Sequence, residues 1–409
     1  MKTTASPPVA MRVVVTGIGW VTSLGRGRDQ VWQALLAGQS GLTPVRSFDA
    51  ARYPSKLGGE IDTFATDHGA DRPGRASQMA CAAARDAVAD AGLDLASLEP
   101  RRVGAGMGTT SGEPREVEQF NDLLVAGKTS EIGAEFLRRY PCHTIVTTLM
   151  GELGLRGPNA MIPTACSAGN YAVAFAFDQL RAGRADAMLA GGADAFSRIT
   201  YTGFARLGAI APEVCQPFDR HRKGMVPGEA AAVLVLEPLR RALERGASIY
   251  AEVAGYGLSC DAHHMTAAHP AGDGGARAMA AALAASELDS DQVSYISAHG
   301  TGTPTNDKLE TLAVKRVFGE RSRRVPISSI KSMLGHTMGA ASAIEAAVCA
   351  LAIRDGVVPP TINYRDPDPE CDLDVVPNEA RSLSVDVAMN NAYAFGGNNA
   401  SVVFRRVRA

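Results

Sequence analysis

One cysteine of this sequence stands in a setting that could make it a nucleophile. Cys166 lies in the run Pro163 to Gly169, read Pro-Thr-Ala-Cys-Ser-Ala-Gly, where an apolar stretch ending at Ile162 gives way to a helical pattern. A thiol at a helix start faces unpaired backbone N–H groups and the positive end of the helix dipole, and both favour the thiolate. The sequence therefore predicts a nucleophilic thiol with a lowered pKa. The alternative is that Cys166 is only a small core residue.

Two histidines further along occupy similar strand-end positions. His299 ends a strand-like run and opens the loop His-Gly-Thr-Gly-Thr-Pro-Thr-Asn-Asp, and ligands of α/β sheets bind at the carboxyl ends of strands. His336 lies between a strand and a small-residue helix, where it could instead be a helix-start residue satisfied by backbone groups. The remaining histidines form no convincing set of metal ligands, so no metal site is predicted: His68, His143, His221, His263, His264 and His269.

Length and composition limit what these residues can serve. The 409 residues are too many for one ordinary core, which predicts two domains or a doubled fold. A hydrophobic fraction of 46% and a net charge of -2 argue against binding to nucleic acid or to an anionic membrane. Seven scattered cysteines without a CxxC pair favour a reducing cytoplasm. No run is apolar enough to span a bilayer, and residues 1–11 are expected to be a disordered leader.

The first part of the chain alternates strand and helix patterns. The expected strands are residues 12–17, 103–108, 184–192 and 230–236. The expected helices are residues 28–36, 77–91 and 167–181, the last two rich in alanine. A polar helical region from Glu113 to Arg139 looks like an insertion, and a cap over the core is predicted around residues 113–145.

A second series resembles the first. Strands are expected at residues 250–257, 293–298 and 325–330, and helices at residues 275–285 and 339–354. This repetition indicates an internal duplication with halves at residues 12–249 and 250–409, although any α/β protein repeats such elements. If the duplication holds, the small-residue helices 167–181 and 339–354 can pack closely at the centre of a layered fold.

Four motifs together resemble a known family. TACSAG, HGTGTPTND, KSMLGHTMGAA and FGGNNAS follow one another in the order and approximate spacing of the β-ketoacyl-acyl-carrier-protein synthases, and the resemblance runs from Arg12 to Phe404. It is strongest to the elongating Cys-His-His branch, which includes synthase II-type enzymes and type II polyketide ketosynthases. The resemblance implies the α/β thiolase-like fold, with duplicated βαβαβ halves in five α-β-α-β-α layers, normally dimeric.

The family's catalytic roles carry over to matching residues. Cys166 matches the nucleophile that takes the acyl chain from a carrier-protein thioester. The backbone N–H groups of Cys166 and Phe395 match the oxyanion hole, and the Phe395 side chain resembles a gate between acyl pocket and malonyl site. His299 and His336 match the pair that promotes malonyl decarboxylation, for which neutral imidazoles donating from Nε2 are most useful.

Other matches surround this set. Lys331 resembles the supporting lysine, Glu345 its acid partner, and Asp307 and Glu310 further supporting groups. No metal or organic cofactor is implied, because the substrates arrive as thioesters on the phosphopantetheine of acyl-carrier protein. The same resemblance leaves open whether a structural monovalent cation is bound.

Two departures bear on the acyl substrate. Ala394 replaces a glycine before Phe395, which is expected to restrict the backbone where the gate swings. Ser111 stands where the family often places a bulky aliphatic residue in the acyl pocket, so longer, more polar or unsaturated chains are expected to fit. Chain length and pathway, fatty acid or polyketide, stay open.

The expected partners are an acidic acyl-carrier protein and a second subunit, either an identical copy or a chain-length-factor-like homologue. Arg72, Arg75 and Arg206 are candidates for a basic docking surface beside the pocket mouth. Two other functions were weighed. A non-catalytic chain-length-factor-like subunit would normally lack the nucleophile, and a coenzyme A thiolase would carry a second catalytic cysteine, whereas Cys371 lies outside any matching motif.

Overall fold

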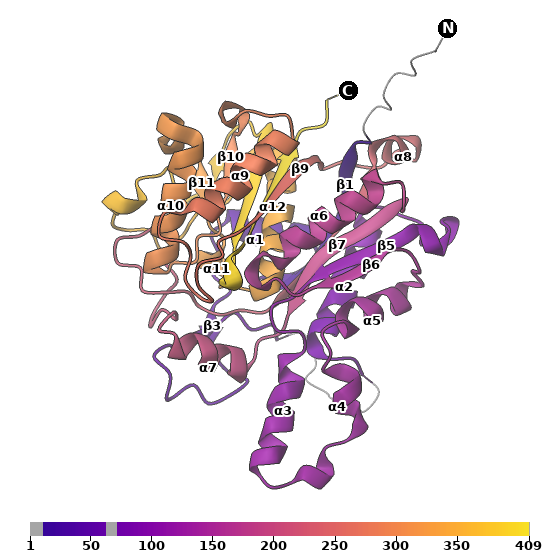
Figure 1. Cartoon of the computed structure of the whole chain (residues 1–409), viewed down its shortest axis with the longest axis vertical. Coiled ribbons are helices and arrows are strands. Elements are labelled where there is room, and N and C mark those ends of the chain that lie inside the picture. Colours follow the sequence, from indigo (N-terminus) through magenta and orange to yellow (C-terminus); the bar gives the residue numbers. More distant parts are fainter. Residues whose placement is uncertain (1–10, 63–71, 409) are drawn as a thin grey trace.

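The computed structural model describes residues 11–62 and 72–408, so the expected leader lies almost wholly outside the described residues. A large central sheet runs through the molecule with helices on both faces (Figure 1). Its first half contains the strands β1 (Val13–Thr22), β5 (Val103–Gly108), β6 (Asn159–Ile162), β7 (Ala187–Asp194) and β8 (Ala230–Pro238). Its second half contains β9 (Ala251–Cys260), β10 (Tyr295–Ser297), β11 (Ile327–Ser328), β14 (Val387–Tyr393) and β15 (Asn398–Arg405).

The two halves have the same strand topology. The strand order is β1-β8-β7-β5-β6 in the first and β9-β15-β14-β10-β11 in the second. In each half the second strand in this order is antiparallel to both of its neighbours, whereas the third, fourth and fifth strands run parallel to one another. β1 and β9 join the halves by antiparallel pairing of Val13–Val15 with Ala251–Val253. The predicted duplication is confirmed by this matching order and direction.

The helices α6 (Ala168–Arg181) and α12 (Ala341–Asp355) lie between the two half-sheets. A Cβ atom added at Gly169 would come within 2.8 Å of both the Ala343 Cβ and the Ser342 Oγ. Ser342 Oγ in turn accepts the backbone N–H of Asn170 at 3.1 Å. The expected close packing of the two small-residue helices is therefore confirmed, and it depends on the missing side chain at position 169.

Outer helices complete five layers. α2 (Arg75–Asp90) and α5 (Thr144–Leu153) cover the first half-sheet, and α9 (Asp273–Ala285) and α10 (Pro304–Phe318) cover the second. Glycines bring strand and helix together: a Cβ at Gly17 or Gly19 would overlap carbonyl oxygens of α2, and one at Gly257 would overlap a carbonyl of α9. The strand expected at residues 12–17 is longer in the structure: β1 continues to Thr22, with a register shift between Val15 and Gly17 in its pairing with β8.

The remaining elements are short or lie at the edges. The helices are α1 (Arg28–Leu36), α7 (Arg198–Arg206), α8 (Leu239–Glu244) and α11 (Lys331–Leu334). The strands are β2 (Gly25–Arg26), β3 (Thr43–Pro44), β4 (Leu57–Gly58), β12 (Val357–Val358) and β13 (Arg381–Ser382). Among the helices in the described parts of the chain, none is long and apolar enough to cross a membrane.

The region expected to form a cap contains α3 (Pro114–Val125) and α4 (Ala134–Arg139), which project together from the body of the molecule (Figure 1). Stacked rings join them, with Phe120 and Phe136 centroids 4.6 Å apart. Glu113 fixes the base, because its carboxylate accepts backbone N–H groups of Ala76 and Ser77 at 3.0 and 2.8 Å. Burial raises the pKa of Glu113 to about 7.

Candidate active site

Cys166 lies at the corner between β6 and α6, in a 3-10 turn that precedes the helix. The turn opens on Ala165 in a left-handed conformation, with φ of 52°. The Cys166 side chain lines a pocket but is only 6% exposed. Burial raises its pKa to about 12, and the positive charge of Lys331 opposes this only in part. The pKa is thus raised and not lowered as expected, because burial removes water from the thiolate and outweighs the attraction of Lys331.

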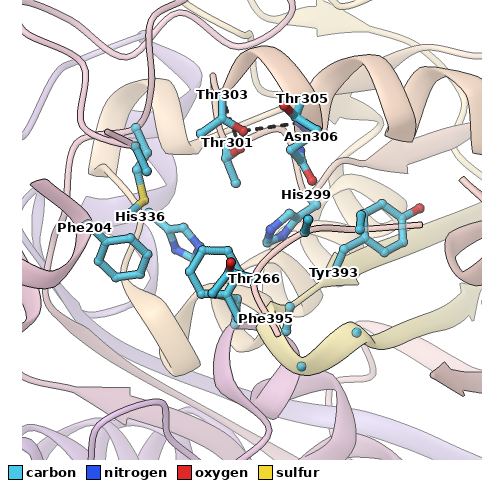
Figure 2. A pocket seen from close by; sticks show the side chains of 18 residues that line it. Phe204, Thr266, His299, Thr301, Thr303, Thr305, Asn306, His336, Tyr393 and Phe395 are labelled. Carbon is cyan, nitrogen blue, oxygen red and sulfur yellow. Dashed lines mark hydrogen bonds between the residues drawn. The ribbon is translucent and has the colours of Figure 1, made fainter. Parts of the chain in front are cut away.

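His299 and His336 line the same pocket as the Cys166 thiol. Figure 2 shows their two imidazole rings in this pocket. Their ring centroids are 5.5 Å apart with the planes at 81°. The Nδ1 atom of His336 accepts the backbone N–H of Met338 at 3.2 Å, so the ring proton sits on Nε2 in the neutral form. Burial, reinforced by Lys331, lowers the pKa of both imidazoles well below its ordinary value. Both rings are therefore neutral at pH 7, as the sequence analysis expected.

Two buried carboxylates shape the loop that His299 opens. Glu310 accepts the backbone N–H groups of His299 and Gly300 at 2.8 and 2.7 Å. Asp307 accepts those of Phe218 and Gly302 at 2.7 and 3.2 Å. Burial raises the pKa of Glu310 to about 8. Both carboxylates thus hold backbone groups of the loop.

Lys331 and Glu345 form a buried ion pair between α11 and α12. Burial raises the pKa of Glu345 to about 7, although the neighbouring Lys331 acts in the opposite direction. Lys331 is not among the residues that line the pocket. Its positive charge nevertheless lowers the pKa of both histidines and of the thiol, so it acts on the pocket through its field.

Phe395 stands at the pocket mouth, 37% exposed, with its ring centroid 5.7 Å from that of Phe204. Gly396 and Gly397 follow with φ of 80° and 76°, a region that L side chains rarely adopt. Ala394 has an extended backbone with φ of -136°, so its methyl group causes no strain in this conformation. Whether it restricts gate movement stays a prediction, as does the oxyanion hole.

Further residues line the pocket that the sequence analysis did not single out. They are Phe204, Ala209, Met225, Thr266, Ala267, Ala268, Thr301, Thr303, Thr305, Asn306 and Tyr393. The threonines after His299 were a usable signal, because they stand in the loop and helix start that follow directly on a strand end. Phe204 gave no such signal, since α7 carries no site motif. Tyr393 did give one, because it ends a strand two residues before Phe395. Among the described residues, no group of three His, Cys, Asp or Glu side chains could hold a metal ion.

Ser111 does not line this pocket. Its backbone N–H donates to the buried Asp194 at 2.9 Å, and its Oγ lies 3.5 Å from that of Thr200. Thr200 is one helical turn before Phe204 on α7, so Ser111 lies beside the face of that helix which also carries Phe204. Its role in an acyl pocket stays a prediction.

The three arginines expected to dock a carrier protein differ in their exposure to solvent. Arg72 and Arg206 are exposed, whereas Arg75 is buried and pairs with Glu229 at 2.7 Å. Glu229 also accepts backbone N–H groups of Ile61 and Phe196, so the pair fastens several segments of the first half together. The assignment of Arg75 to a docking surface is wrong, because its guanidinium is used inside the fold.

Comparisons with known proteins agree with this geometry. The family model for the β-ketoacyl synthase N-terminal domain matches residues 10–242, and that for the C-terminal domain matches residues 250–365. The chain is 44% identical to nodulation protein E of Rhizobium meliloti (strain 1021) and 39% identical to 3-oxoacyl-[acyl-carrier-protein] synthase 2 of a Synechocystis species. Each alignment covers 97% of this chain and at least 98% of the relative.

Solved structures give the same result. The ishigamide ketosynthase/chain length factor superposes with a TM-score of 0.93 at 42% identity, over 98% of this chain and 100% of that one. The ketosynthase of AntDE:AntF superposes with a TM-score of 0.91 at 34% identity, over 98% of this chain and 100% of that one. That structure is described as a type II polyketide acyl-carrier protein in complex with its ketosynthase. Matched in both halves by sequence and by fold, the chain belongs to the β-ketoacyl synthase family of condensing acyltransferases.

Proposed function

We propose that this protein is a carrier-protein-dependent 3-oxoacyl synthase, in which Cys166 carries the growing acyl chain and His299 and His336 activate a malonyl thioester. The observation that carries the proposal is the opening of one thiol and two neutral imidazoles into a single pocket. The proposal rests on the family membership for the reaction class and on this geometry for the residues.

The first half-reaction transfers an acyl group to sulfur. Because the thiol pKa is raised, the Cys166 proton must leave as the sulfur attacks the thioester carbonyl. That proton can pass to the sulfur of the departing carrier thiol, so the acyl transfer needs neither histidine. The carrier thiol then leaves and takes up a proton, and the acyl group remains on Cys166.

The second half-reaction forms the carbon–carbon bond. As the malonyl carboxylate leaves as carbon dioxide, negative charge develops on the thioester oxygen. The Nε2–H of His336 is available to donate to that oxygen, because Nδ1 is occupied by the Met338 N–H. The enolate carbon attacks the acyl carbonyl, the bond to the Cys166 sulfur breaks, and a 3-oxoacyl thioester is released.

The two other functions fit the pocket less well. A non-catalytic chain-length-factor-like subunit has no use for a thiol enclosed with two histidines. A coenzyme A thiolase would bring a second cysteine to the site, but Cys166 is the sole cysteine among the described residues that line this pocket. Cys371 is instead buried in the outer core of the second half.

Acyl-carrier protein and a second ketosynthase-like subunit are the proposed partners. Solved relatives include ketosynthases described with a carrier protein and with a chain length factor. The exposed Arg72 and Arg206 are the remaining docking candidates. The division into halves at residues 12–249 and 250–409, the absence of a free cofactor and the cytoplasmic location stay predictions.

Intact-mass measurement tests the proposal. Incubation with acyl-carrier-protein thioester should add one acyl mass, confined to the peptide that contains Cys166, and malonyl-carrier protein should then release a 3-oxoacyl product. Cys166→Ala should abolish both events and keep malonyl decarboxylation measurable. Acylation at the buried Cys81 or Cys349 in place of Cys166 would sink the assignment.

A further inference from the structure

The two catalytic histidines are held in different ways. His336 has Nδ1 engaged by the Met338 N–H. His299 is also buried, yet within the described part of the chain its Nδ1 has no hydrogen-bond partner. The Glu310 bonds reach only the backbone N–H groups of His299 and its neighbour. Hydrogen bonds therefore fix the path of the His299 main chain but leave the ring orientation to packing.

Aromatic rings supply that packing. Figure 2 shows His299 between His336 and Tyr393. The Tyr393 centroid lies 5.8 Å from that of His299 with the planes at 65°, an edge-to-face arrangement. The ring of His336 lies on the other side of the His299 ring, with the two centroids 5.5 Å apart. Since His336 is itself fixed, Tyr393 is the neighbour that closes the free side of the His299 imidazole.

Tyr393 is in turn held by its own surroundings. It is the last residue of β14, buried, and its hydroxyl points away from His299 (Figure 2). In the described residues that hydroxyl has no hydrogen-bond partner. A Cβ atom added at Gly275 on α9 would lie 2.9 Å from Cε1 and 3.2 Å from the hydroxyl oxygen of Tyr393. The ring thus occupies the space between His299 and a helix that leaves room for it at Gly275.

From these contacts we infer that Tyr393 is a positioning residue for His299, acting through its ring and not through its hydroxyl. The inference extends the proposed function, because it assigns to Tyr393 the orientation of one of the two groups that stabilise the enolate. Gly275 is the residue that admits the ring. A displaced imidazole could still donate a hydrogen bond but would no longer point at the thioester oxygen. A misplacement near 1 Å costs about 100-fold in rate.

Three variants test separately the ring of Tyr393, its hydroxyl group and the space that Gly275 leaves for the ring. Tyr393→Leu removes the ring and should lower malonyl-carrier-protein decarboxylation about 10- to 100-fold, while acylation of Cys166 stays within about threefold of wild type. Tyr393→Phe keeps the ring and should rescue decarboxylation. Gly275→Ala forces the ring to move and should reproduce the selective loss without touching either residue. Equal losses of decarboxylation and acylation in Tyr393→Leu would indicate a merely structural role and overturn the inference.

A spectroscopic measurement decides the point without activity. In protein labelled with ¹⁵N-histidine, the ring signals of His299 are assigned by their absence from His299→Ala. Wild type and Tyr393→Phe should give the same ring shifts, and Tyr393→Leu should move them; unchanged His299 shifts in Tyr393→Leu would overturn the positioning role. If wild type fails both half-reactions, the proposed function falls while this comparison still tests Tyr393.

Discussion

Widening the contact between α6 and α12 should lower both the stability of the protein and its condensation rate. Gly169→Ala adds one methyl group where the nearest side-chain atoms, Ala343 Cβ and Ser342 Oγ, would be 2.8 Å away, with the backbone nitrogen of Ala343 closer still. Ordinary contacts begin at 3.4 Å and the Ala343 backbone nitrogen would be only 2.4 Å away, so the helices must separate by about 1 Å. Neither neighbour can swing aside, because both belong to the buried face of α12.

The magnitude follows from two opposing effects. Overpacking a core typically costs about 1–3 kcal/mol, and the rigid backbone contact argues for the upper end. Replacing a helical glycine with alanine stabilises the helix by about 1 kcal/mol, which offsets part of this cost. The free energy of unfolding should therefore fall by about 2 kcal/mol. Cys166 lies three residues before the change, so the thiol should also shift, with a loss of up to about 100-fold in condensation rate.

Urea unfolding and a condensation assay measure the two effects. Gly151→Ala on α5 is the matched control, because it is the same change in a helix but nothing lies within 4 Å of the added methyl group. The control should be as stable as wild type or up to about 1 kcal/mol more stable. If Gly169→Ala behaves like Gly151→Ala in both stability and rate, the close packing does not control the site and the reasoning is refuted.

Four further outcomes are expected. His299→Ala and His336→Ala should each block malonyl-carrier-protein decarboxylation but spare some acylation of Cys166; the reverse pattern would contradict the assigned roles. Because the pKa of both histidines lies well below its ordinary value, the rings stay neutral and decarboxylation should be flat between pH 6 and 8, whereas a fall centred near pH 6.5 would show protonation there. Ser111→Ile should slow elongation of long acyl chains by about 5- to 150-fold, the equivalent of about 1–3 kcal/mol, and spare short primers; an unchanged chain-length profile would remove Ser111 from the acyl pocket. Arg206→Glu should raise the KM for carrier-protein substrates only, and an equal rise for small thioester analogues would exclude a docking role.

Sequence reasoning succeeded where a residue's place follows from local pattern. Cys166, His299 and His336 each follow a strand, and the ends of neighbouring strands lie together in a layered sheet, so their meeting in one pocket could be predicted. Phe204 could not be found this way, because it reaches the pocket through the packing of α7 against other elements. Tyr393 could have been, because it ends β14, the neighbour of β10, two residues before Phe395.

Two errors have the same physical origin. A run of basic residues looks exposed in a sequence, but the partner of Arg75 is Glu229, which is distant along the chain and close in the fold. The helix start beside Cys166 was anticipated correctly, yet burial governs the pKa of the thiol. In both cases the deciding quantity is exposure to water, which depends on the complete tertiary structure.

The doubled topology also relates two parts of the site to each other. The corner from β6 to α6 that holds Cys166 corresponds to the corner from β11 to α12 that holds His336, and each contains a 3-10 turn whose first residue, Ala165 or Met338, has φ near 50°. The same bend thus holds the nucleophilic thiol in one half and the hydrogen-bond donor to the enolate oxygen in the other. The second half contains both histidines but lacks the thiol, so neither half alone should form the carbon–carbon bond, even if it folds.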